Sequence, residues 1–137
     1  MVRRWVTACE EETRRLGATL AAELRPAGLL LLYGEMGSGK TVLAVGVGEA
    51  LGVERREIQS PTFTLVHEHL GHDTEFLHID LFRLSPEEAM EVGLEELLAR
   101  HAVIVVEWAE RLPFVPPGGL RLRISRDGER RILEEMR

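Results

Sequence analysis

Residues 34–41 form a glycine-rich loop that follows an apolar run of strand length. The run at 29–33 reads LLLLY, and the loop after it reads GEMGSGKT. This octapeptide matches G-x-x-x-x-G-K-[ST], which is typical of a phosphate-binding loop when a buried strand precedes it and a helix follows. A helical segment at 40–51, ending before Gly52, supplies the second flank. The sequence therefore predicts a strand, a phosphate-binding loop and a helix in succession.

The residue types in this loop suit contact with a nucleoside triphosphate. Gly34, Gly37 and Gly39 permit backbone conformations and a close approach that a side chain would block, so that successive N–H groups and the next helix N-terminus can surround phosphates. Lys40 is the only lysine among 17 Lys and Arg residues and is expected to contact the β- and γ-phosphates, while the Thr41 hydroxyl ligates Mg²⁺. The alternative is a glycine-rich turn that binds nothing. The nucleotide-binding prediction for this segment comprises Glu35, Met36, Gly37, Ser38, Gly39, Lys40, Thr41 and Val42.

Composition and charge limit the class of protein. The 137 residues are enough for one domain, 1–137, around a single core. The formal net charge is −6 and no cluster of Lys and Arg exceeds two residues, whereas proteins that bind nucleic acid directly usually carry a basic patch. Any link to tRNA or other nucleic acid is therefore expected to run through a partner. A single cysteine, together with no membrane-length apolar run and no apolar signal segment at the N-terminus, favours the cytoplasm.

Helix and strand patterns alternate along the rest of the chain. A short edge strand at 4–6 precedes a helix over about 8–24, for which Thr7 and Glu10 form a T-x-x-E capping box. Gly46 and Gly48 indicate close packing of the 40–51 helix on the sheet. Further expected elements are a hairpin of 64–69 with 74–81, helices starting at Ser85 and at Leu94 after Gly93, a buried parallel strand at 102–106, and a terminal hairpin of 120–125 with 130–134. This order predicts a three-layer α/β/α fold with a mainly parallel sheet and antiparallel C-terminal strands.

Two acids that follow apolar strands are candidates for a magnesium site. Glu107 closes the run at 102–106, and Asp80 follows the segment FLHI at 76–79. A phosphate-binding loop needs such a carboxylate on Mg²⁺, at the end of a neighbouring strand. We therefore predict that Thr41, Glu107 and Asp80 bind the metal and that Lys40, Asp80 and Glu107 are catalytic. The alternative for either acid is a solvated strand end or a helix cap.

Other polar and aromatic residues leave alternatives open. The hydroxyls of Ser60, Thr62 and Thr64 either contact a γ-phosphate, as in a switch loop, or belong to a turn fixed by proline. Trp108 either shields the site, anchors a partner or fills the core. The five histidines lack helical H-x₃-H spacing and a cysteine partner, which favours structural or solvated histidines over a metal site. Cys9 is interpreted as a helix-face residue because no catalytic motif surrounds it.

Four motifs, in this order, resemble one family of proteins. GEMGSGKT, SPTFTLV, HIDLFRL and VEW together are similar to the TsaE (YjeE) family, small bacterial P-loop ATPases of tRNA threonylcarbamoyladenosine biosynthesis. The resemblance extends from the first helix, around residues 12–17, to the terminal hairpin. Phe63 and Phe82 stand where tyrosine is common in the family, and the C-terminal end is short.

The resemblance implies a cytoplasmic ATPase with two protein partners, TsaB and TsaD. TsaD transfers a threonylcarbamoyl group to the adenosine beside the anticodon, and the family hydrolyses ATP to reset the TsaB–TsaD pair between turnovers. Two other functions remain open from the sequence: a small P-loop kinase, although no arginine-rich lid segment is visible, and a nucleotide-gated binding module with negligible hydrolysis.

The resemblance also assigns roles to individual residues. In the family's arrangement, ATP or ADP lies on the phosphate-binding loop with Mg²⁺ between the loop threonine and the strand-end glutamate. By position, Lys40 would contact the β- and γ-phosphates, Thr41 and Glu107 would hold Mg²⁺, and Asp80 would lie near the γ-phosphate. Ser60 to Thr64 correspond to the family's switch loop and Trp108 to its functional tryptophan. Glu10 and Arg130 would flank the nucleotide.

Overall fold

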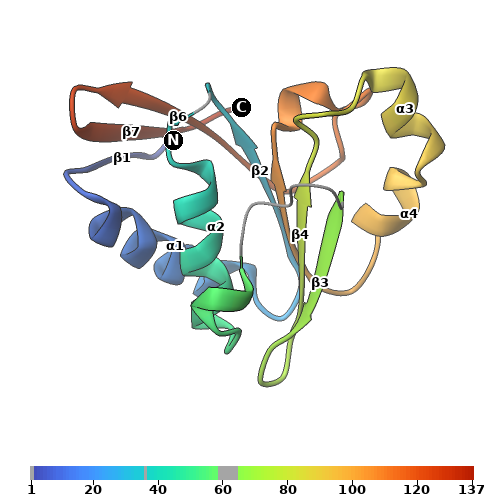
Figure 1. Ribbon diagram of the computed structural model, residues 1–137, viewed down its shortest axis with the longest axis horizontal. Helices are drawn as coiled ribbons and strands as arrows, with labels where there is room; N and C mark the ends of the chain where they lie inside the picture. The colour runs from blue at the N-terminus through green and yellow to red at the C-terminus, as the bar shows by residue number, and fades with distance from the viewer. Residues whose placement is uncertain (1, 36, 59–64) are drawn as a thin grey trace.

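The computed structural model describes residues 2–35, 37–58 and 65–137. These residues form a seven-stranded sheet with the strand order β1-β7-β6-β2-β5-β4-β3 (Figure 1). In chain order, the strands are β1 (Arg4–Thr7), β2 (Gly28–Tyr33), β3 (Val66–Leu70), β4 (Glu75–Asp80), β5 (Val103–Glu107), β6 (Leu120–Asp127) and β7 (Arg130–Glu135).

The middle of the sheet is parallel and its two margins are antiparallel. β2 pairs in parallel with both β5 and β6, and β4 pairs in parallel with β5. The β3–β4 and β6–β7 hairpins are antiparallel, and β1 adds to β7 in the same sense. Both predicted hairpins and the predicted layered α/β fold are confirmed. The sheet is mixed because β3 and β7, the outer strands of the two hairpins, run antiparallel to the strands beside them.

Helices cover both faces of the sheet. α1 (Glu10–Leu24) and α2 (Lys40–Ala50) lie on one face, and α3 (Pro86–Glu91) and α4 (Leu94–Leu98) lie on the other (Figure 1). Along β2, Leu30 and Leu32 pack toward α1 and α2, whereas Leu31 packs in the second core with α3 and α4. Burial on both faces explains why β2 is continuously apolar and does not alternate. Within the described residues, no helix has the length and apolar character needed to cross a membrane.

Glycines allow α1 and α2 to cross at close range. A Cβ on Gly46 would lie 2.1 Å from the backbone oxygen of Arg14, and a Cβ on Gly17 would lie 2.5 Å from that of Leu43. A Cβ on Gly48 would instead meet side chains, among them Phe76 of β4 at 2.9 Å. The expected packing on the sheet is therefore correct for Gly48 and wrong for Gly46, which packs against α1.

The start of α1 differs from the predicted capping box. The helix begins at Glu10 with Cys9 as its N-cap, and Cys9 makes no side-chain capping bond. The Thr7 hydroxyl instead lies 2.7 Å from that of Thr13, while a Glu12 carboxylate oxygen accepts a 2.7 Å hydrogen bond from the Ala8 N–H. Because the helix begins at Glu10, Glu12 is its third residue, the position that the predicted capping box assigns to Glu10.

The start of α3 agrees with the predicted capping box. The Ser85 hydroxyl accepts from the Glu88 N–H, and the Glu88 carboxylate accepts from the Ser85 N–H, both at 3.2 Å. Gly93, with a φ of 72°, separates α3 from α4. The short 3₁₀ helices are η1 (Arg55–Glu57) and η2 (Ala109–Arg111).

Candidate functional site

The phosphate-binding loop connects the end of β2 to the start of α2. Gly34 has a φ of 145° and Gly39 a φ of 110°, conformations that residues with a Cβ rarely adopt. At Gly34 a Cβ would also lie 2.3 Å from the backbone oxygen of Ile124 in β6. The loop therefore needs glycine at both positions to lie against β6 and to begin α2 at Lys40.

The Lys40 ammonium is buried beneath the loop that precedes it. Lys40 is 5% exposed, and its Nζ donates hydrogen bonds to the backbone oxygens of Gly34 and Glu35. Burial lowers the pKa of Lys40, and the nearby carboxylates, Glu110 first, then Glu107 and Asp80, oppose this shift. The loop thus holds a desolvated cation close to several acids.

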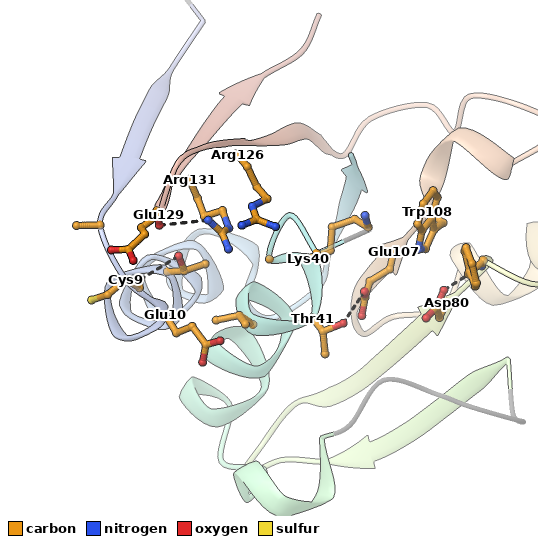
Figure 2. A pocket seen from close by; sticks show the side chains of 16 residues that line it. Cys9, Glu10, Lys40, Thr41, Asp80, Glu107, Trp108, Arg126, Glu129 and Arg131 are labelled. Atoms are coloured by element: carbon orange, nitrogen blue, oxygen red, sulfur yellow. Dashed lines mark hydrogen bonds between the residues drawn. The ribbon is translucent and has the colours of Figure 1, made fainter. Parts of the chain in front are cut away.

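The two candidate acids lie side by side on neighbouring strands. Asp80 of β4 and Glu107 of β5 are partners in the parallel register, each at the last residue of its strand. Thr41 Oγ1 donates a 2.8 Å hydrogen bond to Glu107 Oε1, and Figure 2 shows these three side chains together with Lys40 at one end of a pocket. Asp80 Oδ1 also accepts a 2.9 Å hydrogen bond from the Phe82 N–H. The carboxyl ends of parallel strands therefore bring both acids to the first turn of α2, where ligands bind in open α/β sheets.

Thr41 and Glu107 bring two oxygen atoms of the kind that Mg²⁺ prefers to one point of the site. A hydrogen bond of 2.8 Å joins Thr41 Oγ1 to Glu107 Oε1, and hydroxyl and carboxylate oxygens are usual ligands of that ion. Within the described ranges, no group of three or more His, Cys, Asp or Glu side chains is placed to hold a metal ion. Mg²⁺ usually takes one or two protein oxygens and completes its shell with phosphate oxygens and water, and the Thr41 hydroxyl and the Glu107 carboxylate are oxygens of that kind.

A cavity of about 690 Å³ extends over the loop. Its walls come from the start of α1, the loop, the first turn of α2, the ends of β4 and β5, and the β6–β7 hairpin (Figure 2). The volume lies within the range of about 300–1,000 Å³ that is usual for small-molecule sites. The cavity is therefore large enough for a small ligand that touches both the loop and the hairpin.

The cavity brings together most of the described residues that the sequence singles out. The predicted site residues that line it are Glu10, Gly37, Gly39, Lys40, Thr41, Val42, Asp80, Glu107 and Trp108. Glu35 and Ser38 do not line it: Glu35 is exposed and contributes its carbonyl to Lys40, and Ser38 is buried with its hydroxyl 3.5 Å from the ammonium. Four further predicted positions, Met36, Ser60, Thr62 and Thr64, lie outside the described residues.

Two arginines of the β6–β7 hairpin line the cavity, and Arg130, which the family resemblance assigns to the nucleotide, is not one of them. Arg126 and Arg131 are directly opposite one another across β6 and β7 and both line the cavity. Arg130 does not line the cavity, and its guanidinium pairs with Asp127 at 2.7 Å on the exposed surface. Since successive strand residues face opposite sides, Arg131 and not Arg130 faces the cavity, and a place for Arg130 beside the nucleotide stays a prediction. Like charges paired across strands repel, so an anion in the cavity would stabilise this pair.

Trp108 closes the end of the cavity next to the acids. Its φ of 59° and ψ of 45° place it in the left-handed region between β5 and η2. Its ring centre lies 4.1 Å from Lys40 Nζ and 4.9 Å from the ring centre of Phe82. The ring is half-buried and packs on the core next to α3 and α4. Trp108 is thus both part of a core and a wall of the site.

His78 is a site residue that the sequence reasoning did not identify. It is fully buried, and its Nε2 lies within hydrogen-bond distance of Glu107 Oε2. The signal was present in the spacing, because His78 lies two residues before Asp80 on the same strand and therefore on the same face. The other end of the Glu107 carboxylate is the oxygen that accepts from Thr41.

Comparisons with known proteins place this arrangement in a family. A family model described as threonylcarbamoyl adenosine biosynthesis protein TsaE matches residues 7–133. The tRNA threonylcarbamoyladenosine biosynthesis protein TsaE of Streptomyces coelicolor is 44% identical over 118 residues, covering 82% of this chain and 78% of that protein. The protein of the same name from Treponema pallidum is 34% identical over 133 residues, covering 94% and 97%.

A solved structure agrees with these sequence matches. The crystal structure of Bacillus subtilis YdiB matches with a TM-score of 0.76 and 30% identity, over 98% of this chain and 84% of that one. The match extends over the α/β fold on which the loop and both acids lie. The family match over residues 7–133 and the identities over most of each chain show that this chain belongs to the TsaE family.

Proposed function

We propose that this chain binds ATP with Mg²⁺ and hydrolyses the ATP in the service of tRNA threonylcarbamoyladenosine biosynthesis. The observation that carries the proposal is the contact between Thr41 and Glu107, beside Asp80, at the base of the phosphate-binding loop. Membership of the TsaE family supports the biosynthetic role.

Each part of the cavity has a distinct role in this proposal. Loop N–H groups and the Lys40 ammonium would bind the β- and γ-phosphates. The negative charge of the phosphates would offset the cost of burying the ammonium. Thr41 and Glu107 would hold Mg²⁺, which when bound neutralises charge on the phosphate oxygens. Asp80 would either ligate that metal or orient the attacking water. The Arg126 and Arg131 pair and the start of α1 would contact the rest of the nucleotide.

The reaction in this proposal is the transfer of a phosphoryl group to water. The oxygen of water forms a bond to the γ-phosphorus as the bond from that phosphorus to the bridging oxygen breaks, and ADP and phosphate leave. The proton lost by the water passes to a phosphate oxygen or through Asp80 to solvent. No side chain is required to form a covalent intermediate.

The partners in this proposal are TsaB and TsaD. A net charge of −6 disfavours direct contact with a polyanion, so tRNA would be reached through the TsaB–TsaD pair. Phosphate release with purified TsaB and TsaD, compared with the chain alone, tests the dependence on partners. Hydrolysis that increases with the partners supports the proposal, whereas ATP-dependent docking without hydrolysis would favour a nucleotide-gated binding module.

Substitutions separate binding from turnover. Lys40→Ala should weaken ATP binding by roughly ten- to 100-fold, because hydrogen bonds to charged groups are worth about 1.5–3 kcal/mol. Glu107→Gln and Asp80→Asn should suppress hydrolysis while the melting temperature stays near that of the parent chain. Glu87→Gln, at an exposed acid of α3, is the matched control. Normal hydrolysis in a folded Asp80→Asn or Glu107→Gln chain would contradict the assignment.

A further inference from the structure

The Glu107 carboxylate is held by protein donors at both of its oxygens. The Glu107 side chain is 3% exposed, and a buried carboxylate is costly unless it accepts hydrogen bonds. Thr41 Oγ1 donates to Oε1, and the His78 Nε2–H donates to Oε2. One donor comes from α2 and the other from the neighbouring strand β4, so the carboxylate is fixed between two elements.

The tautomer of His78 follows from its surroundings. A carboxylate only accepts, so Nε2 must carry the proton that joins His78 to Glu107. The other ring nitrogen, Nδ1, is buried and has no hydrogen-bond partner in the described part of the chain. A bare ring nitrogen at that position avoids an unpaired buried N–H donor. The imidazole is therefore oriented with its single donor toward Glu107.

Ring packing keeps the imidazole in this orientation. Phe76 and His78 lie on the same face of β4, and their rings are stacked with centres 6.1 Å apart. Phe76 is stacked in turn on His69 of β3, with centres 5.8 Å apart. His78 has no exposed surface, so its ring cannot turn toward solvent without disturbing this stack.

We propose that His78 is a positioning residue that sets the metal affinity of the site by fixing the Glu107 carboxylate. This inference rests on the proposed function, since it presumes that Glu107 is a metal ligand. The Thr41 and Glu107 oxygens already lie side by side through their hydrogen bond, and both are of the kind that Mg²⁺ takes as ligands. The His78 bond to the opposite oxygen keeps the carboxylate from rotating when the Thr41 hydroxyl turns its proton away. Partners that orient a metal ligand in this way typically contribute about ten- to 100-fold in affinity.

The test measures the affinity of the chain for Mn²⁺, a probe for Mg²⁺, in the presence of ADP. The electron paramagnetic resonance signal of the free ion gives the unbound concentration. His78→Phe keeps a ring in the stack and removes the donor. We expect its Mn²⁺ affinity to fall by about ten- to 100-fold, while its ADP affinity in EDTA stays within about twofold. A structural role alone would lower both affinities or neither, so the difference between them is the informative readout.

His69→Phe is the matched control, because it makes the same change in the same ring stack. His69 stacks on Phe76, and its substitution should leave Mn²⁺ affinity unchanged. A folded His78→Phe chain with parental Mn²⁺ affinity would overturn the inference, as would an equal loss in His69→Phe. If the unsubstituted chain fails to bind Mn²⁺ with ADP, the proposed function fails instead.

A second pair of variants keeps the test decisive if His78→Phe does not fold. In His78→Gln the amide N–H reaches about as far as Nε2, whereas the shorter His78→Asn side chain cannot reach Glu107. We expect His78→Gln to restore Mn²⁺ affinity to within a few-fold and His78→Asn to lose it. Equal affinities in the two variants would refute the positioning role.

Discussion

The Lys40 ammonium lies 4.1 Å from the centre of the Trp108 ring. The same ammonium donates to the carbonyls of Gly34 and Glu35, so loop oxygens and an aromatic face share one buried cation. A cation over the face of tryptophan is stabilised by the ring quadrupole. Any phosphate that binds Lys40 therefore changes the electrostatic surroundings of Trp108.

This contact predicts a fluorescence signal for nucleotide binding. The chain has two tryptophans, and Trp5 does not line the cavity. In a Trp5→Phe chain, ADP with Mg²⁺ should change the Trp108 emission, and the change should saturate at the affinity found by calorimetry. The matched Trp108→Phe chain, which keeps Trp5, should show no change. Equal responses in both chains would argue against the Lys40–Trp108 contact.

Arg130 and Arg131 are adjacent in β7 but are predicted to differ in their contribution to ATP affinity. Arg131 lines the cavity, whereas Arg130 pairs with Asp127 on the surface. Arg131→Ala should weaken ATP binding by about tenfold or more, since a hydrogen bond to a charged group contributes about 1.5–3 kcal/mol. Arg130→Ala should leave the affinity nearly unchanged. Calorimetric titration of both variants measures the difference, and a larger loss in Arg130→Ala would show that the hairpin presents the other arginine.

Two histidines predict loss of stability in acid. Burial lowers the pKa of both His67 and His69 from 6.5, and neighbouring histidines lower it further, while Glu57 raises that of His69. The unfolded chain therefore binds more protons than the folded chain as the pH falls below 6.5. The resulting stability is present above pH 6.5 and is lost as the pH falls through the lowered pKa values.

Melting temperatures recorded from pH 7.5 to about 5 test this sign. The melting temperature should fall across that interval, and the fall should be smaller in His69→Phe, because one of the two titrating groups is removed. A flat profile for the parent chain, or an equal slope in His69→Phe, would contradict the assignment.

The crossing of α1 and α2 predicts unequal costs for two glycines of the same helix. A Cβ on Gly46 would meet backbone of α1, whereas a Cβ on Gly48 would meet the side chains of Ile58 and Phe76. Gly46→Ala should cost about 1–3 kcal/mol, as overpacking usually does, and more than Gly48→Ala. Denaturant unfolding of both variants gives the comparison. Greater stability of Gly46→Ala would mean that the helices can separate without penalty.

The parts of the site that follow from position along the chain were predictable. The apolar run at 29–33 and the GKT sequence locate the loop, and Asp80 and Glu107 reach the site because each ends a strand that joins the parallel part of the sheet. Local pattern is sufficient in these cases because parallel strands end at one edge of the sheet.

The parts that depend on contacts across strands, or on helix phase, were not predictable. The bond of His78 to Glu107 requires knowing that β4 lies next to β5. The choice of Arg131 over Arg130 depends on the phase of β7 relative to the cavity. Similarly, T-x-x-E at Thr7 and Glu10 matches a capping pattern, but the helix begins at Glu10. A shift of one or two residues changes which side chain faces inward, and sequence spacing does not determine that shift.

The pairing of Asp80 with Glu107 also affects how this protein can vary. Both acids are set by the hydrogen-bond ladder between two buried strands, so one residue inserted within 75–80 would turn the acid to the opposite face of the sheet. The β6–β7 hairpin carries the same constraint, because Arg126 and Arg131 are partners in its ladder. A change of side-chain type can therefore reshape the cavity, whereas a residue inserted into either ladder would turn an acid or an arginine away from it.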